Sequence, residues 1–130
     1  MRYEFSPKVS VREISELRKS VGWNGMEECY KDSLKGSYFY ICCYEGNKLI
    51  GFLDVVSNGV TDAYIQDVMV KPEYQGKGIG TNLMNLAIKK LKEDNIYMIS
   101  VLFDEPLLPF YKEFGFNITL SGQLETHHID

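Results

Sequence analysis

Apolar and polar residues follow two different periods along this chain, one typical of strands and one typical of helices. Period-two runs predict strands over residues 1–5, 38–44, 48–57 and 63–70. Ser10-Val11-Arg12-Glu13 is a capping box, which predicts a helix through about Val21. Gly22–Gly25 breaks that helix, and a second helix is expected over Met26–Leu34. Glu45-Gly46-Asn47 predicts a hairpin turn between two of the strands.

The second half of the chain predicts further elements in alternation. Apolar residues at helical spacing predict an amphipathic helix that ends near Asp94: Leu83, Met84, Ala87, Ile88 and Leu91. A strand over Ile96–Phe103 and a short helix over Pro106–Phe114 follow, with Gly115 as C-cap. Two final strands, Phe116–Leu120 and Gln123–His127, are expected to pair across a turn. The predicted order is β-α-α-β-β-β-α-β-α-β-β, an α/β fold with a single mixed, mostly antiparallel sheet flanked by helices.

Composition narrows the class of protein. The chain has 130 residues and a formal charge of −4, which suits one domain over residues 1–130 and disfavours a nucleic-acid partner. No apolar run has the length of a membrane span, and the first ten residues lack a signal-peptide core, so we expect a cytoplasmic protein without a membrane partner. The three cysteines have no CxxC spacing, and His127-His128 has no ligand cluster nearby, so no metal site is expected.

The strongest chemical signal is a glycine-rich loop, Gln75-Gly76-Lys77-Gly78-Ile79-Gly80, between a strand and the amphipathic helix. Such a loop suits a phosphate, because glycines let the backbone approach closely and the helix N-terminus is partially positive. The Walker pattern and the G-x-G-x-x-G dinucleotide pattern are both absent here. What stands in their place is Gln75-x-x-Gly78-x-Gly80.

At these residues the sequence resembles the GNAT superfamily of acyl-CoA N-acyltransferases, whose pyrophosphate loop reads [Arg/Gln]-x-x-Gly-x-[Gly/Ala]. The stretch from Tyr64 to Leu91 is similar to the family throughout. A second match is Phe110-Tyr111-Lys112-Glu113-Phe114-Gly115-Phe116, the family's Phe-Tyr-x-x-x-Gly-Phe. The predicted element order also agrees over nearly the whole chain.

The resemblance implies a site for acetyl-CoA as co-substrate. The backbone of Val68, Met69 and Val70 would pair with the pantetheine arm, because the family's sheet splays beside this strand. The loop would hold the pyrophosphate with the residues Gln75, Gly76, Lys77, Gly78, Ile79, Gly80 and Thr81. Lys77 would either add charge near the phosphates or be solvated. Asp104 stands where relatives often have an asparagine that contacts the cofactor.

The resemblance also implies candidate catalytic residues. Tyr111 matches the general acid, a phenol that protonates the departing thiolate. Relatives often use a carboxylate on the central strand as base, and this strand offers Gln66 and Asp67, of which only Asp67 can be a base. Adjacent strand residues point to opposite faces, so we expect only one of the two to face the acceptor. Asp67 as base, Asp67 as a structural carboxylate and a water chain all stay open.

The implied function is transfer of an acetyl group from acetyl-CoA directly to a primary amine, with a small-molecule acceptor and a possible homodimer. The acceptor pocket is expected between the first two helices, the splayed strands and the C-terminal hairpin, with candidate lining residues Trp23, Tyr30, Tyr38 and Tyr40. The alternative is a non-catalytic acyl-CoA-binding or sensor module on the same fold. A nucleotide-binding domain is disfavoured by the two absent phosphate patterns.

Overall fold

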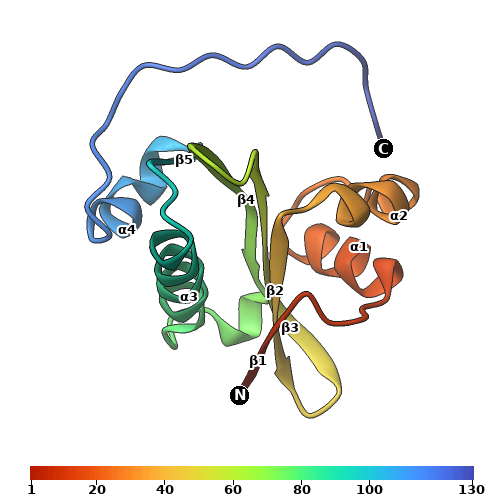
Figure 1. Cartoon of the computed structure of the whole chain (residues 1–130). Helices are drawn as coiled ribbons and strands as arrows, with labels where there is room; N and C mark the ends of the chain where they lie inside the picture. Colours follow the sequence, from red (N-terminus) through yellow and green to blue (C-terminus); the bar gives the residue numbers. More distant parts are fainter.

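The computed structural model describes residues 1–130 as one five-stranded sheet with helices on both faces (Figure 1). The strands lie in chain order: β1 (Arg2–Phe5), β2 (Phe39–Glu45), β3 (Lys48–Ser57), β4 (Asp62–Val70) and β5 (Met98–Val101). The first four pair antiparallel, and β5 pairs parallel with β4. The predicted fold class, a mixed and mostly antiparallel sheet, is therefore confirmed.

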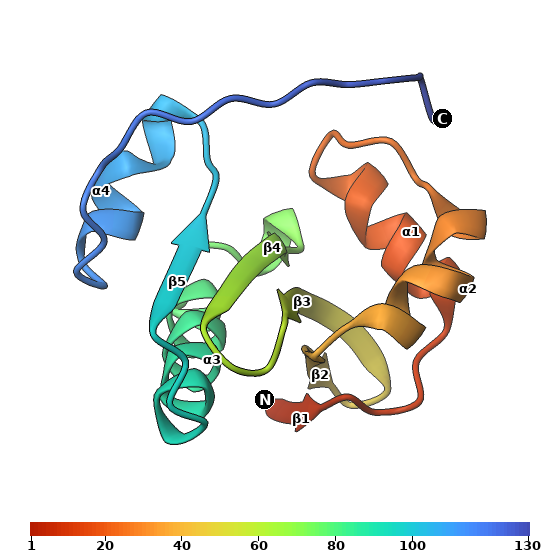
Figure 2. The ribbon, with the colours of Figure 1, turned by 45° about the horizontal axis from the view of Figure 1, so that its top comes forward.

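Two layers of helices cover the sheet. On one face lie α1 (Val11–Ser20) and α2 (Glu27–Gly36), and on the other lie α3 (Ile79–Glu93) and α4 (Leu108–Lys112) (Figures 1 and 2). Short 3-10 turns cover Pro72–Tyr74 and Glu105–Leu107. The predicted cap of α1 is present, since Ser10 Oγ accepts a hydrogen bond from the amide of Glu13. None of the helices is long and apolar enough to cross a membrane.

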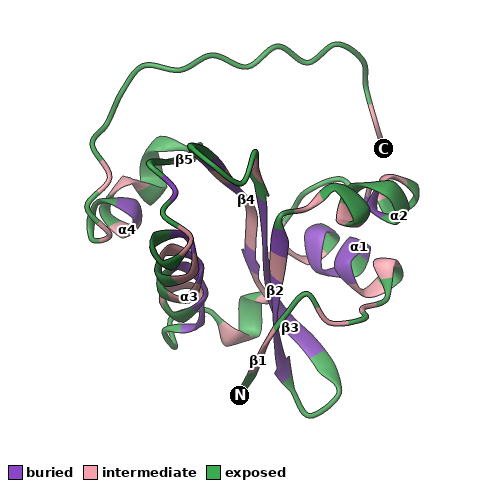
Figure 3. Ribbon diagram, viewed as in Figure 1, coloured by how far each residue is buried: buried purple, intermediate pink, exposed green.

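Each helical layer closes its own apolar core against the sheet. Leu83, Met84 and Leu91 of α3 are fully buried against one face, while Ile14 and Leu17 of α1 are buried against the other. Cys42 and Cys43 point into opposite cores, as the strand period predicts. Burial is thus concentrated along the sheet and the inner sides of the helices (Figure 3).

The C-terminal segment differs from the prediction. Residues 117–130 contain no strand, so the expected strands Phe116–Leu120 and Gln123–His127 and the hairpin between them are wrong. The segment instead runs extended from α4 back toward α2 (Figures 1 and 2). Its end is held there, because Asn24 Nδ2 donates to the carbonyl of Ile129 and the amide of Met26 donates to that of Asp130. This attachment holds the end of the segment beside the α1–α2 loop, so its two halves do not fold back on each other as a hairpin.

Candidate active site

The glycine loop presents a continuous row of free backbone donors. None of the six consecutive amides from Gly76 to Thr81 donates a hydrogen bond within the chain. Gly76 and Gly78 have φ of 77° and 85°, the left-handed region that glycine adopts without steric cost. Gly78 is also the N-cap of α3 and has no side-chain cap. These donors therefore add to the positive end of the α3 dipole and suit an anionic ligand.

Side chains around the loop leave this row open. Gln75 Nε2 donates to the carbonyl of Val70, 2.9 Å away, so one donor of the predicted phosphate contact is turned back onto β4. The Lys77 ammonium lies 5.4 Å from the centre of the Tyr74 ring, at cation–π distance. Gly80 faces Phe110, and a Cβ there would stand 3.5 Å from that ring. The loop is thus held at one end by the Gln75 hydrogen bond and at the other by packing of Gly80 against Phe110. Its amides have no partner within the chain.

The edge of β4 beside the loop is also unpaired. Pairing between β4 and β5 runs from Asp62 to Ile65 and stops there. The predicted splay is therefore present, and the β5 side of Val68, Met69 and Val70 has no strand beside it. Figure 2 shows the two strands diverging beyond this point. An extended ligand with amide groups could satisfy these backbone groups as an added strand would.

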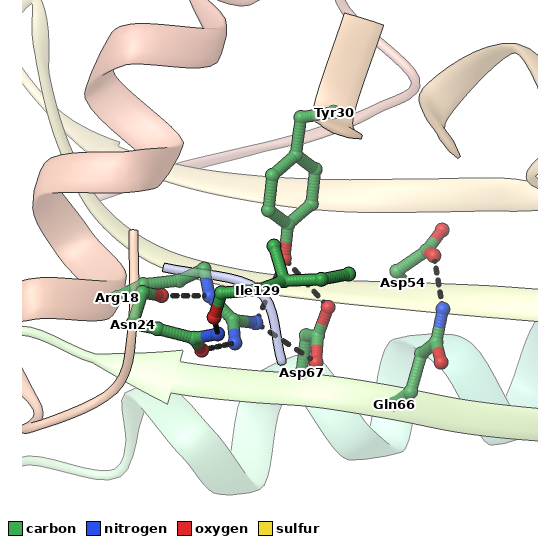
Figure 4. A network of polar contacts seen from close by, with 7 residues as sticks. All are labelled: Arg18, Asn24, Tyr30, Asp54, Gln66, Asp67 and Ile129. Atoms are coloured by element: carbon green, nitrogen blue, oxygen red, sulfur yellow. Dashed lines mark hydrogen bonds and ion pairs between the residues drawn. The ribbon is translucent and has the colours of Figure 1, made fainter. Parts of the chain in front are cut away.

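A β-bulge in β4 changes which side chains share a face. Asp54 pairs with Gln66 and Phe52 pairs with Met69, so Leu53 alone opposes two residues, one of which is Asp67. Asp67 has φ of 55°, a left-handed backbone. Gln66 and Asp67 consequently both point to the α1–α2 face (Figure 4). The expectation that they face opposite ways was wrong, because strand alternation fails at a bulge.

Asp67 is held by a network from both helices of that face. Its Oδ1 lies 3.3 Å from Nη1 of Arg18, and its Oδ2 accepts a 2.6 Å hydrogen bond from the Tyr30 hydroxyl. Arg18 is 7% exposed and also donates to the backbone carbonyl and side-chain oxygen of Asn24. Trp23 lies against the same guanidinium, 5.2 Å from its ring centre. The network joins α1, α2 and the bulge (Figure 4).

A second polar pair sits beside this network. Asp54 is 1% exposed, and its carboxylate accepts hydrogen bonds from Ser37 Oγ and from Gln66 Nε2, the latter at 2.8 Å. Burial raises the pKa of Asp54 above its ordinary value, and the two hydrogen bonds oppose that shift. Because Gln66 donates through Nε2, its carbonyl oxygen is left to accept from another partner.

Tyr111 lies in an aromatic cage on the other side of the splay. Its ring stacks on Phe103 at 4.4 Å and meets Phe110 edge-on at 5.0 Å. Tyr111 is 6% exposed, and its hydroxyl makes no hydrogen bond within the chain. That oxygen is not fully buried, so it remains accessible to a ligand or to water. Burial raises the pKa of Tyr111, and the nearby Tyr64 raises it further. Burial raises the pKa of Tyr64 as well, and the charge of Asp67 raises it further.

Comparison with known proteins decides the family. Residues 8–116 match the pattern of the Acetyltransferase (GNAT) family. The chain belongs to the GNAT acetyltransferase family. It is 34% identical over 117 residues to an uncharacterized N-acetyltransferase, ycf52, of Gracilaria tenuistipitata var. liui, with 86% of this chain and 64% of that protein covered. It is 31% identical over 126 residues to a histone acetyltransferase of Glycine max, covering 88% of this chain and 54% of that protein.

Solved GNAT structures have the same fold. A probable acetyltransferase of meticillin-resistant Staphylococcus aureus superposes with a TM-score of 0.84 at 25% identity, over 98% of this chain and all of the other. The chain nevertheless spans less than two thirds of the length of the curated relatives that it matches first. What those relatives do as whole proteins is therefore not assigned to it.

Within this GNAT fold, the structure brings together some predicted acceptor-side residues and separates others. Tyr30 and Trp23 lie at the Arg18–Asp67 network. Tyr40 lies on the same face, stacked near Phe52, with its hydroxyl bonded to the carbonyl of Pro7. Tyr38 is elsewhere: it precedes the first residue of β2, and its hydroxyl donates to Asp94 at the C-terminal end of α3.

Sequence reasoning missed Arg18 and Asp54, the two buried charges of this face. Each carried a signal. Arg18 lies four residues after Ile14, on the apolar stripe of α1, where a charge needs a partner. Asp54 is the one carboxylate within the apolar run of β3. Both positions identify a buried charge, but their partners become visible only when the elements pack.

Proposed function

We propose that this GNAT protein transfers the acetyl group of acetyl-CoA directly to a primary amine. The observation that carries the proposal is the adjacency of two sets of backbone groups that no strand fills, of which one group, the Val70 carbonyl, accepts from Gln75 Nε2. The free amides of Gly76–Thr81 suit a diphosphate, and the unpaired edge of Val68–Val70 suits the amides of a pantetheine arm. Coenzyme A carries a diphosphate and a pantetheine arm in one molecule, so one ligand can match the loop amides and the β4 edge together.

Acetyl-CoA is a thioester, and an amine can attack the carbonyl carbon of its acetyl group. Transfer forms one C–N bond, breaks one C–S bond, removes a proton from the amine and returns a proton to sulfur. In the proposal, Tyr111 gives the proton to sulfur. Its free hydroxyl supports this role, and its raised pKa keeps it protonated at neutral pH.

Asp67 is our candidate for receiving the proton of the amine. The bulge turns it to the face of Gln66, and a quarter of its side chain is exposed. Oδ2 of Asp67 already accepts from Tyr30 and Oδ1 forms an ion pair with Arg18, but each oxygen retains a lone pair. The carbonyl oxygen of Gln66, oriented by Asp54, is placed to accept an N–H of the same amine. A chain of water molecules is the competing route for the proton.

Direct transfer needs no acyl-enzyme. Cys29, Cys42 and Cys43 are all free, which also supports a reducing, cytoplasmic setting. Burial raises the pKa of Cys42 to about 12, so its thiolate is scarce at neutral pH. We therefore expect no acetylated cysteine when the protein is incubated with acetyl-CoA and its intact mass is measured.

The test is release of free thiol from acetyl-CoA against a broad panel of amines: polyamines, amino sugars, arylalkylamines, amino acids and peptide N-termini. The proposal expects amine-dependent thiol release and an N-acetyl product of matching mass. Binding of acetyl-CoA by calorimetry without release for any amine would favour the non-catalytic module. An absence of binding would contradict both functions.

A further inference from the structure

Hydrogen bonds attach the C-terminal segment, residues 117–130, to the rest of the chain only at its far end. The side-chain amide of Asn24 donates to the carbonyl of Ile129, and the backbone amide of Met26 donates to that of Asp130 at 3.2 Å. Residues 117–128 are all exposed, whereas Ile129 is half-buried. The segment therefore spans from α4 to the α1–α2 loop and is docked there by its last two residues (Figures 1 and 2).

The loop that receives this end is itself fixed to α1. The amide of Trp23 donates to the carbonyl of Arg18, and the Arg18 guanidinium donates to both oxygens of Asn24. Gly25 is buried against the same helix, where a Cβ would stand 2.6 Å from Ser15 Oγ. Because the loop is packed this closely, any opening at the docking point has to come from the segment.

The docked end lies close to the proposed base. Asn24 Oδ1 accepts from Arg18, and Nη1 of the same guanidinium lies 3.3 Å from Asp67 Oδ1. Asn24 thus joins the segment on one side to the ion pair on the other. Figure 4 shows Ile129 at this network, together with Tyr30 and Asp67. Movement of the segment's end consequently changes the surroundings of the Asp67 carboxylate.

Little holds the end in place. Two neutral hydrogen bonds at a protein surface contribute a small net free energy, because water replaces them on detachment. Holding the exposed residues 117–128 in one path costs conformational entropy, and this cost opposes attachment. The balance favours two accessible forms, one docked and one detached.

We infer that Ile129 and Asp130 form a gate that restricts which amines reach Asp67. A quarter of the Asp67 side chain is exposed with the gate docked, so a small amine reaches it, whereas a bulky amine needs the gate detached. The kcat/KM for a bulky acceptor is then reduced by the fraction of time that the gate is detached. The inference rests on the proposed function, because it concerns the acceptor of that reaction, and it makes Ile129 a specificity-determining residue.

The first test concerns docking alone and needs neither acetyl-CoA nor an amine. Hydrogen exchange of the Met26 amide should be slowed by its bond to Asp130, whereas the Glu27 amide, which donates to no carbonyl, should exchange freely. Ile129→Asp puts a charge where a half-buried apolar side chain lies and should remove the protection of Met26. Leu124→Asp adds the same charge at an 87% exposed residue of the same segment and should keep it. An unprotected Met26 amide in the wild type, or equal protection in the two variants, overturns the inference.

The second test measures thiol release with amines of increasing size, from glycine through the polyamines to a peptide N-terminus. The ratio of kcat/KM in Ile129→Asp to that in the wild type should rise with acceptor size. It should reach roughly tenfold for the peptide if the wild-type gate is detached about a tenth of the time. Ile129→Ser detaches the end without adding a charge and should show the same trend, while Leu124→Asp should match the wild type for every amine.

Two different failures are distinguishable in these experiments. A ratio that does not depend on acceptor size, with the Met26 amide protected in the wild type, would show that the end docks without selecting acceptors, which overturns the gate. Transfer to no amine at all would refute the proposed function and the gate that rests on it, whereas the exchange of Met26 would still report whether the end is docked.

Discussion

The two sides of this site differ in the groups that form them: backbone on one side and side chains on the other. The proposed donor side consists of backbone: the amides of Gly76–Thr81 and the edge of Val68–Val70. The proposed acceptor side consists of side chains that α1, α2, β3 and β4 bring together around Asp67 and Gln66. Every residue carries the same backbone groups, so the donor side depends on a few glycines. The acceptor side depends on individual residues, which suits a common donor and an acceptor particular to each protein.

The largest effect is expected where the backbone donors are disturbed. Gly78→Val places a branched side chain at φ of 85°, which costs about 1–3 kcal/mol and displaces the amides around it. Losing several hydrogen bonds to charged phosphates should weaken acetyl-CoA binding roughly a thousandfold by calorimetry. Gly46→Val is the matched control: Gly46 also has a positive φ, and an added Cβ meets nothing within 4 Å at either position.

The comparison between the two glycines separates strain from ligand contact. Gly46→Val should lose stability to a similar extent and still bind acetyl-CoA as the wild type does. If both variants bind normally, the amides of the loop do not hold the donor, and the backbone account of this side is wrong.

The next effect concerns Tyr111, in the aromatic cage of Phe103 and Phe110. Tyr111→Phe removes only the hydroxyl and should lower kcat roughly a hundredfold, with little change in acetyl-CoA affinity. The thermal midpoint should hold, because that hydroxyl has no partner within the chain. Tyr97→Phe, at an 80% exposed ring, should leave kcat unchanged. A wild-type kcat in Tyr111→Phe would show that Tyr111 only packs within the aromatic cage and is not the general acid.

The raised pKa of Tyr111 also fixes the sign of the pH dependence. An acid acts in its protonated form, and burial moves the loss of that form to higher pH than the usual 10.0. The Tyr111-dependent part of kcat should therefore not decline as pH rises from 7 to about 9. A decline between pH 8 and 9 that is absent from Tyr111→Phe would contradict this assignment.

On the acceptor side, Asp67→Asn should lower both kcat and stability, because Asp67 is the proposed base and also faces Arg18. It removes the charge that faces the buried guanidinium of Arg18, and urea melts should show an unfolding free energy lower by about 2 kcal/mol. Tyr30→Phe removes the other hydrogen bond to Asp67, so the two changes should be non-additive. Asp62→Asn, at the exposed start of β4, is the control. If Asp67→Asn loses stability and keeps the wild-type kcat, Asp67 supports the bulge and is not the base.

The smallest effect is the pH dependence of stability due to Asp54. Burial raises the pKa of this carboxyl in the folded state, so its protonated form favours folding. The unfolding free energy of the wild type should therefore fall as pH increases from 3.8 through the raised folded value, and then level off. In Asp54→Asn this fall of the unfolding free energy should be absent when urea melts are compared over the same pH range. An identical slope in both proteins would mean that Asp54 titrates normally.

The sequence predicted the geometry of the proposed donor side well, because its features are local. Glycine spacing, the strand before the loop and the amphipathic helix after it are all contained within about thirty residues. The positive φ of Gly76 and Gly78 and the free amides follow from that spacing. The splay beside Val68–Val70 came from resemblance to the family, and the pairing of β4 with β5 confirms it.

The acceptor side could not be predicted in the same way. The bulge at Asp67 depends on how β3 and β4 align, and no local pattern marks it because Asp67 is not a glycine. Its consequence, two adjacent side chains on one face, reverses an inference that is sound for a regular strand. The residues 116–127 have a strand pattern, but their pairing partner is not fixed by that pattern, and within this chain they do not pair.

The measurement that tests the central account most directly is a titration of ¹⁵N-labelled protein with acetyl-CoA, followed by amide chemical shifts. We expect the largest shifts at the amides of Gly76–Thr81 and at Val68–Val70, with smaller changes at Tyr30 and Gln66. That result would place the donor on the backbone groups that the fold leaves unpaired. Saturable binding that leaves those amides unmoved and shifts the acceptor-side residues instead would contradict the division of the site into a backbone half and a side-chain half.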